Sequence, residues 1–123
     1  MSNIRLYGTF ELKGDILEVI YPSFEPSVEE YKDYLKRLDT FILNDKKINI
    51  IYDTTNSKYL SADNRILQSN WIKLRQKELK ENVKMMYFII PSLPVRLVLK
   101  TILAFSPLPC PHEVVKDRSE IKL

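Results

Sequence analysis

The sequence predicts an α/β fold that forms a single domain over residues 1–123, with helices packed on a mixed sheet. The length of 123 residues is enough for one hydrophobic core and too short for two ordinary domains. Near the N-terminus, apolar and polar residues alternate with the period of a strand. Farther along, apolar runs alternate with segments of helical period, which is typical of parallel strands joined by right-handed crossovers.

The first two elements predict a hairpin. Residues 4–12 alternate apolar and polar side chains, as expected for a half-buried strand. Residues 13–15 follow as a tight turn, because Gly14 can adopt a positive φ. Residues 16–21 form the second strand, which is expected to pair back on the first.

Residues 28–42 predict the clearest amphipathic helix of the chain. Ser27 precedes the helix and is a favourable N-cap, while Glu29 and Glu30 occupy its first turn. Along the segment, apolar residues recur three or four positions apart, which places them on one face of the helix. They are Val28, Tyr31, Leu35, Leu38 and Ile42.

The middle of the chain predicts a strand, a loop and a helix. Residues 46–53 contain a continuous apolar run, typical of an inner strand covered on both faces, and Asp53 ends it. Residues 54–59 are mostly polar and predict a loop. Ser61 is then placed to cap a second helix, which continues to about residue 80. The core side of that helix is expected to carry Leu67, Trp71 and Leu74.

The last third of the chain predicts two strands around one more helix. Residues 83–90 form a buried strand, and residues 95–105 form a third helix that is apolar on nearly every side. A proline-rich turn then leads to a short final strand at residues 113–116. The predicted order is therefore ββαβαβαβ, with an N-terminal hairpin followed by βαβ units.

Several residue types are too scarce for common kinds of site. With 2 glycines, the chain lacks the glycine-rich loops that hold nucleotide phosphates. The one cysteine, Cys110, excludes an intramolecular disulfide and favours a reducing, cytoplasmic setting. Cys110 and His112 could form a nucleophile and its base, although a rigid proline-rich turn is the preferred interpretation. Asp53 and Asp63 flank one loop without further ligand residues, so we predict no catalytic residue, metal or cofactor.

Charge is divided unevenly along the chain. Residues 1–45 carry 5 basic and 9 acidic side chains, whereas residues 46–123 carry 14 and 7. Glu78 and Glu81 interrupt the basic residues of the second helix and no nucleic-acid-binding motif accompanies them, so nucleic acid is not an expected partner. The N-terminal residues lack a signal-peptide pattern, and Lys100 interrupts the longest apolar stretch, so no membrane-spanning segment is predicted.

Residues at two strand ends, at the helices that follow them and in a proline-containing turn together resemble the pattern of a known protein family. Asp53 ends a strand and is followed by a helix with an early arginine, Arg65. Ser92 follows another strand, and Arg96 lies four residues later at the start of an apolar helix. A proline-containing turn at residues 107–109 then leads to the final strand. In this order the chain resembles the STAS fold of sulfate-transporter and anti-sigma-factor-antagonist domains, and more closely the small bacterial SpoIIAA-like (STAS/SEC14-like) stand-alone proteins.

The resemblance implies a non-enzymatic regulatory or interaction module, and two departures from the family bear on how it works. Anti-sigma antagonists are phosphorylated on a serine or threonine before a glycine at the start of the second helix. Here Asp63 lies near that position without the glycine, and Ser61 is expected to act as an N-cap, so a phosphorylation switch is not favoured. Relatives also continue with a terminal helix, whereas residues 120–123 provide about one turn and leave a surface open for a partner.

Two binding hypotheses follow for this module. The first is protein binding, including self-association as a homodimer, through the start of the second helix and the apolar third helix. The second is a small carrier or sensor for a lipid or apolar molecule beneath the third helix, with Arg96 and Lys100 near anionic headgroups. A cavity of roughly several hundred cubic ångströms under that helix favours the second hypothesis. The candidate binding residues are Asp53, Ser61, Asp63, Asn64, Arg65, Arg96, Leu99, Lys100 and Leu103.

Overall fold

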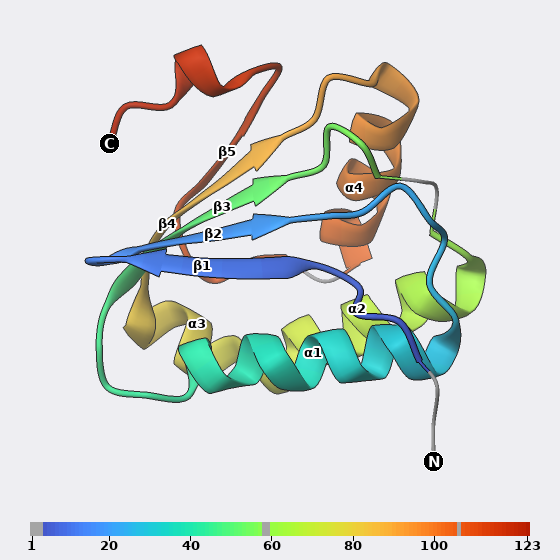
Figure 1. Cartoon of the computed structure of the whole chain (residues 1–123). Coiled ribbons are helices and arrows are strands. Elements are labelled where there is room, and N and C mark those ends of the chain that lie inside the picture. The colour runs from blue at the N-terminus through green and yellow to red at the C-terminus, as the bar shows by residue number, and fades with distance from the viewer. Residues whose placement is uncertain (1–3, 58–59, 106) are drawn as a thin grey trace.

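A computed structural model describes residues 4–57, 60–105 and 107–123, and within these ranges the chain forms a two-layer α/β structure (Figure 1). The remaining residues, which include the end of the predicted loop 54–59, lie outside the described ranges. The elements in chain order are β1 (Thr9–Lys13), β2 (Ile16–Ile20), α1 (Val28–Ile42), β3 (Ile48–Asp53), α2 (Ala62–Leu74), α3 (Gln76–Asn82), β4 (Val83–Ile89), α4 (Leu93–Phe105), β5 (His112–Val115) and the short 3-10 helix η1 (Arg118–Glu120).

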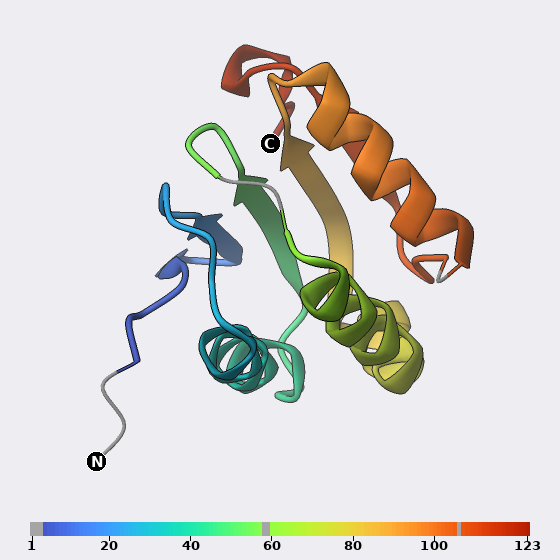
Figure 2. The same cartoon turned by 90° about the vertical axis from the view of Figure 1, so that its right-hand side faces the viewer.

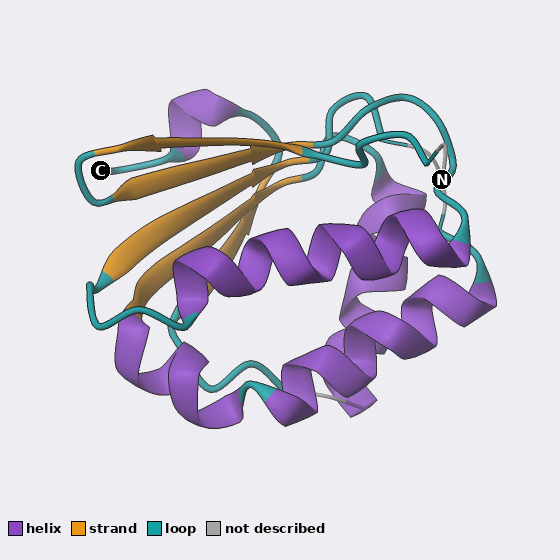
Figure 3. Cartoon of the chain, turned by 60° about the horizontal axis from the view of Figure 1, so that its bottom comes forward, coloured by secondary structure: helices purple, strands orange, loops and turns teal. Residues whose placement is uncertain are grey.

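The strands form one mixed sheet in the order β1-β2-β3-β4-β5. β1 and β2 are antiparallel around the predicted turn, where Gly14 has a φ of +62°, and each later strand is parallel to the one before it. Each connection between parallel strands leads to the next strand in the same direction across the sheet. Because such connections are right-handed, the helices within them all lie on one face of the sheet. Figure 2 shows α1, α2 and α4 in that order along this face, and Figure 3 shows long helices in front of the strands. The predicted mixed α/β fold with an N-terminal hairpin is confirmed.

Residues 4–8 lie outside the sheet, so the first strand begins later than predicted. Gly8 adopts a φ of +96°, which glycine tolerates and other residues disfavour, and the chain turns there before β1. A Cβ atom at this position would lie 3.1 Å from the ring of Tyr34. Arg37 of α1 donates hydrogen bonds of 2.8 Å to the carbonyl oxygens of Tyr7 and Gly8. These bonds hold the segment against α1.

α1 begins with a capping box, which confirms Ser27 as its N-cap. The Ser27 hydroxyl accepts a hydrogen bond of 3.1 Å from the Glu30 amide, and the Glu30 carboxylate accepts one of 2.8 Å from the Ser27 amide. The guanidinium of Arg5 donates two further bonds, of 2.9 and 3.0 Å, to the same carboxylate. Glu30 therefore connects the start of α1 to the N-terminal segment.

These contacts predict an acid-sensitive contribution to stability. The Arg5 guanidinium and the Ser27 amide lower the pKa of Glu30 from 4.5 to about 2. Because the folded pKa is below the unfolded value, the contribution is complete above pH 4.5 and is lost as the pH falls toward 2. We expect the urea midpoint to fall more steeply in this window for the wild type than for Glu30→Gln. Glu29→Gln, which changes an exposed neighbour, is the control, and equal slopes for wild type and Glu30→Gln would refute the assignment.

The predicted second helix is divided in two at Arg75. The break leaves Arg75 with a φ of −99° and a ψ of 18°, and its guanidinium bonds to Asp39 of α1. Trp71 is buried, as predicted, but Leu74 is 67% exposed and its place in the core prediction was wrong. The break shifts the helical phase, so that Leu79 of α3 is fully buried instead.

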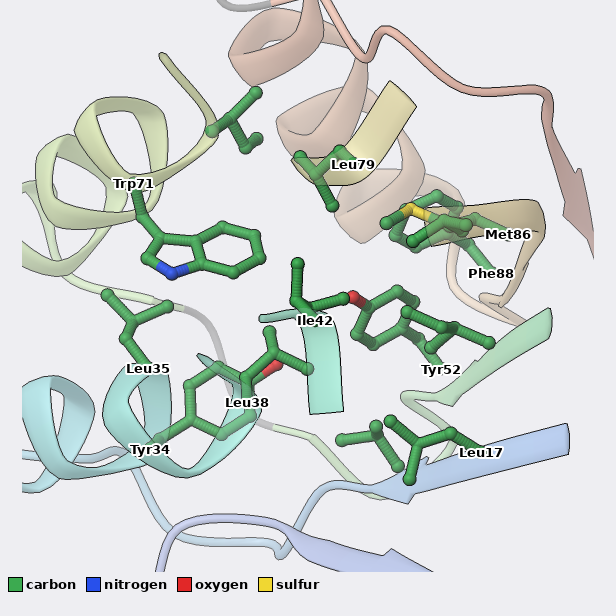
Figure 4. Packing of buried hydrophobic residues seen from close by; sticks show 14 of the residues in the cluster. Leu17, Tyr34, Leu35, Leu38, Ile42, Tyr52, Trp71, Leu79, Met86 and Phe88 are labelled. Atoms are coloured by element: carbon green, nitrogen blue, oxygen red, sulfur yellow. The ribbon is translucent and has the colours of Figure 1, made fainter. Parts of the chain in front are cut away.

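The main core lies between the helical layer and the sheet. Figure 4 shows side chains of α1, α2 and α3 meeting those of the strands in one cluster. Its members include Leu17, Leu38, Ile42, Ile50, Trp71, Leu79 and Met86. β3 is an inner strand, as predicted, because Ile48–Tyr52 are all buried. No helix in the described ranges is both long enough and apolar enough to cross a bilayer.

The second face of the sheet carries a smaller cluster and is partly covered by the C-terminal segment. Ile51 and Tyr87 are buried there, and Ile121 packs against the cluster. Arg118 of η1 bonds to Glu18 on β2 and, at 3.0 Å, to Asp53 at the end of β3. η1 and Ile121 therefore cover part of this second face of the sheet, and the open surface expected for a partner stays a prediction.

Candidate functional site

A pocket of about 630 Å³, its open mouth included, lies between α4 and the sheet. Its floor is formed where β3 and β4 end, at Tyr52, Thr54, Phe88 and Ile90. In open α/β sheets, ligands bind beyond the carboxyl ends of the parallel strands, so this pocket occupies a favoured position. The other lining residues are Tyr7, Tyr21, Tyr31, Ser57, Leu60, Gln68, Val95, Val98, Leu99 and Ile102.

The pocket is apolar and uncharged. Its α4 wall consists of aliphatic side chains, and no charged side chain is among its described lining residues. A second pocket of about 400 Å³ shares six of these residues, including Tyr31 and Leu99, and extends toward Trp71 and Met86. The two spaces together form a slot between the sheet and the helices.

Four tyrosines line the main pocket, and they come from four different parts of the chain. Tyr7 precedes β1, Tyr21 follows β2, Tyr31 is in α1 and Tyr52 is in β3. The ring centroid of Tyr7 lies 5.5 Å from that of Tyr21 and 5.8 Å from that of Tyr31. Burial raises the pKa of all four hydroxyls well above the ordinary value of 10, so they are protonated donors at neutral pH.

The predicted binding residues of α4 have different environments. Leu99 is 7% exposed and belongs to both the core and the pocket lining, and Leu103 is half-buried against the core. Arg96 donates a hydrogen bond of 3.0 Å to the carbonyl oxygen of Ile90, while Lys100 is exposed. The outward apolar side chains of α4 are instead Leu93, Leu97 and Phe105.

The predicted residues around α2 have structural contacts outside the pocket. The Ser61 hydroxyl caps α2 by accepting from the Asn64 amide at 3.2 Å, which confirms the N-cap prediction. The Asn64 side chain is buried and donates to the carbonyl of Pro26 at 2.9 Å. Asp63 is exposed in the first turn, and Arg65 lines a separate groove between α2 and α4.

Asp53 is held by its own neighbours at the end of β3. Its carboxylate accepts hydrogen bonds from the amide and hydroxyl of Thr55, at 3.0 and 2.6 Å, and from Arg118 at 3.0 Å. Burial raises the pKa of this carboxyl, but the bonds from Thr55 and Arg118 outweigh that effect and lower it. The ionised carboxylate thus fixes the loop after β3 and the C-terminal segment.

Cys110 and His112 do not have the geometry of an activated pair. Burial raises the pKa of the Cys110 thiol to about 11, so the thiol is protonated at neutral pH. His112 Nδ1 lies 3.2 Å from the carbonyl oxygen of Cys110 rather than facing its sulfur. In the described ranges, no three potential metal-ligating side chains of histidine, cysteine, aspartate or glutamate form a group.

The comparisons with known proteins place this architecture in a family. The model of the divergent CRAL/TRIO domain family matches residues 15–113. The chain belongs to this family. The match includes every described lining residue of the main pocket except Tyr7. A search of curated proteins finds no match for this divergent CRAL/TRIO domain.

One solved structure confirms the expected SpoIIAA-like fold of this CRAL/TRIO domain. It is an uncharacterised protein of the DUF3478 family from Shewanella loihica, described as having a SpoIIAA-like fold. The two chains are 18% identical, the match covers 98% of this chain and 94% of the other, and the TM-score is 0.63. Family and fold together fit a small binding module.

The tyrosine cluster was absent from the sequence-based site prediction. The helical spacing predicts a core position for Tyr31 alone, whereas Tyr7 precedes β1, Tyr21 follows β2 and Tyr52 lies in β3. The available signal was the number of tyrosines, which is 7 in 123 residues. That number indicates a tyrosine-rich interior but not which rings meet.

Proposed function

We propose that this divergent CRAL/TRIO domain is a non-enzymatic binding module that holds an apolar small molecule between α4 and the sheet. The strongest support is the pocket itself, of about 630 Å³ with its mouth included and lined by aliphatic and aromatic side chains. Small-molecule sites are mostly apolar clefts lined by hydrophobic and aromatic side chains with a few polar groups, and the lining of this pocket has that character. The buried thiol of Cys110 fits a reducing, cytoplasmic setting for the module.

The packing of α4 explains why space remains beneath it. Of its 13 residues, Leu99 and Ile102 are buried, whereas Val95 and Val98 are half-buried and line the pocket. These two valines and the tyrosines line the same unfilled space. An apolar ligand that fills the space gains about 25 cal/mol for each square ångström of apolar surface removed from water.

The proposal predicts that filling the pocket weakens the binding of an apolar molecule. 2-Ethylnaphthalene is a neutral fluorescent probe, and we expect the wild type to bind it in a saturable 1:1 complex. Val95→Trp places an indole in the pocket and is expected to weaken this binding by at least about tenfold. Fluorescence titration measures both affinities.

Leu93→Trp is the matched control for this experiment. Leu93 is in the same helix, is 58% exposed and is not a lining residue of the pocket, so its variant should bind like the wild type. The proposal fails if the wild type shows no saturable binding, or if Val95→Trp binds as tightly as Leu93→Trp.

A second candidate function is protein binding, supported by a separate apolar surface on α2 and α4. Ile66, Leu97 and Phe105 are 58%, 54% and 74% exposed, and all three line an open groove between the two helices. Exposed apolar clusters of this kind often mark interaction sites. Light scattering over a concentration series tests self-association. A dimer that Phe105→Glu converts to a monomer supports a homodimer, and a wild-type monomer at every concentration contradicts it.

A further inference from the structure

Three tyrosine hydroxyls in the pocket have no hydrogen-bond partner among the described residues. Tyr7, Tyr31 and Tyr52 line the pocket and are 2%, 2% and 5% exposed, whereas Tyr21 bonds to a neighbouring tyrosine. In the part of the chain that is described, Asn64 Oδ1 is the one side-chain polar atom that is both sealed and unpaired. The three hydroxyl oxygens are therefore not sealed inside the protein. Because the three side chains are buried and line the pocket, we take the open space that these oxygens reach to be the pocket.

The rings that carry these hydroxyls lie near one another. The ring centroid of Tyr7 lies 5.8 Å from that of Tyr31 and 5.5 Å from that of Tyr21, and the centroid of Tyr21 lies 6.3 Å from that of Tyr52. Burial is the largest cause that raises the pKa of Tyr31. The proximity of Tyr7 and Tyr52 raises this pKa further, because each would repel a phenolate at Tyr31. One end of an apolar slot thus presents several protonated donors at once, supplied by the N-terminal segment, α1 and β3.

We propose that the pocket selects an uncharged, largely apolar molecule with an acceptor oxygen, such as the carbonyl of a ketone or ester, to which two of the hydroxyls of Tyr7, Tyr31 and Tyr52 donate hydrogen bonds at a time. This inference rests on the proposed function and adds the chemical class of the ligand. A carbonyl oxygen has two lone pairs and can accept from two phenols at the same time.

The lining of the pocket disfavours the two alternative classes of ligand. No charged side chain lines either the main pocket or its neighbour in the described ranges. A carboxylate or phosphate would lose its hydration there without gaining a cationic partner. A pure hydrocarbon would fill the slot and leave the phenol donors unpaired and shielded from water. An uncharged acceptor avoids both penalties.

Three naphthalene probes of nearly equal size test the proposal. They are 2-ethylnaphthalene, which has no acceptor, 2-acetylnaphthalene, which has a carbonyl, and 2-naphthoate, which is an anion at neutral pH. We expect the acetyl probe to bind about 3- to 30-fold more tightly than the ethyl probe, as one or two net hydrogen bonds provide. 2-Naphthoate should bind more weakly than the acetyl probe.

Hydroxyl deletions show whether the tyrosines cause this preference. Tyr31→Phe and Tyr52→Phe keep the ring and are expected to weaken the acetyl probe about 2- to 10-fold while leaving the ethyl probe unchanged. Tyr87→Phe is the matched control, because it removes the same atom from a buried tyrosine on the opposite face of the sheet. It should change neither affinity.

The outcomes separate this inference from the proposed function. If the ethyl and acetyl probes bind equally, or if the hydroxyl deletions weaken both probes alike, selection by the tyrosines is refuted and the pocket remains a site for apolar molecules. If 2-naphthoate binds most tightly, the uncharged class is refuted. If no probe binds, both the inference and the proposed function are refuted.

Discussion

Leu99→Glu is expected to prevent the chain from folding. Leu99 is 7% exposed, belongs to the main core and lines the pocket from α4. The substitution removes a buried leucine and places a carboxylate in an uncharged lining, which together cost about 5 kcal/mol or more. This loss is comparable with the total stability of a small domain, about 5–15 kcal/mol. Far-UV circular dichroism and thermal unfolding of the purified variant measure the effect.

Leu97→Glu is the control for this prediction. Leu97 lies two residues earlier in the same helix and is 54% exposed, so its variant should remain folded with a change of about 0.5 kcal/mol or less. A well-folded Leu99→Glu protein would contradict the packing of α4. It would instead agree with the hypothesis, drawn from sequence, that Leu99 and Leu103 contact a partner.

Asp39→Ala is expected to lower the free energy of unfolding by about 2–3 kcal/mol. Asp39 accepts a hydrogen bond of 2.8 Å from Trp71 Nε1 and two of 3.0 Å from the guanidinium of Arg75. The carboxylate and guanidinium side chains are 20% and 22% exposed. Alanine leaves an indole N–H and a cation without their acceptor where α1 meets the break between α2 and α3. Urea denaturation followed by the fluorescence of the single tryptophan measures the loss.

Asp33→Ala makes the same change elsewhere on α1 and serves as the comparison. Asp33 pairs with Arg37 at 3.0 Å, but Arg37 also donates to two backbone carbonyls and keeps those bonds in the variant. The expected cost is about 0.5 kcal/mol. Equal losses for the two variants would mean that Asp39 does not connect the helices as described.

The elements of the fold were predictable where local chemistry decides them. The capping box at Ser27, the hairpin turn at Gly14 and the apolar run of β3 each depend on residues that are neighbours in sequence. The break at Arg75 was not predictable in this way. It coincides with hydrogen bonds to Asp39, which is 36 residues away, and no spacing in the sequence indicates such a contact.

The candidate site was predictable in location but not in composition. The apolar character of residues 95–105 indicated a helix with space or a partner beside it, and the pocket lies beneath α4. Tyr7, Tyr21 and Tyr52 were missed because their convergence depends on how the hairpin segment, β3 and α1 pack together. Arg96 was expected to lie near anionic lipid headgroups. Its guanidinium instead donates a hydrogen bond to the carbonyl oxygen of Ile90, which follows β4.

An NMR titration can show whether an uncharged apolar molecule binds between α4 and the sheet. Two-dimensional ¹H–¹⁵N spectra of the wild type are recorded with increasing 2-acetylnaphthalene. We expect saturable shift changes that are largest at the amides of pocket residues such as Tyr21, Tyr52 and Leu99. Changes confined to Ile66 and Phe105 in the outer groove, or the absence of saturable changes, would contradict it.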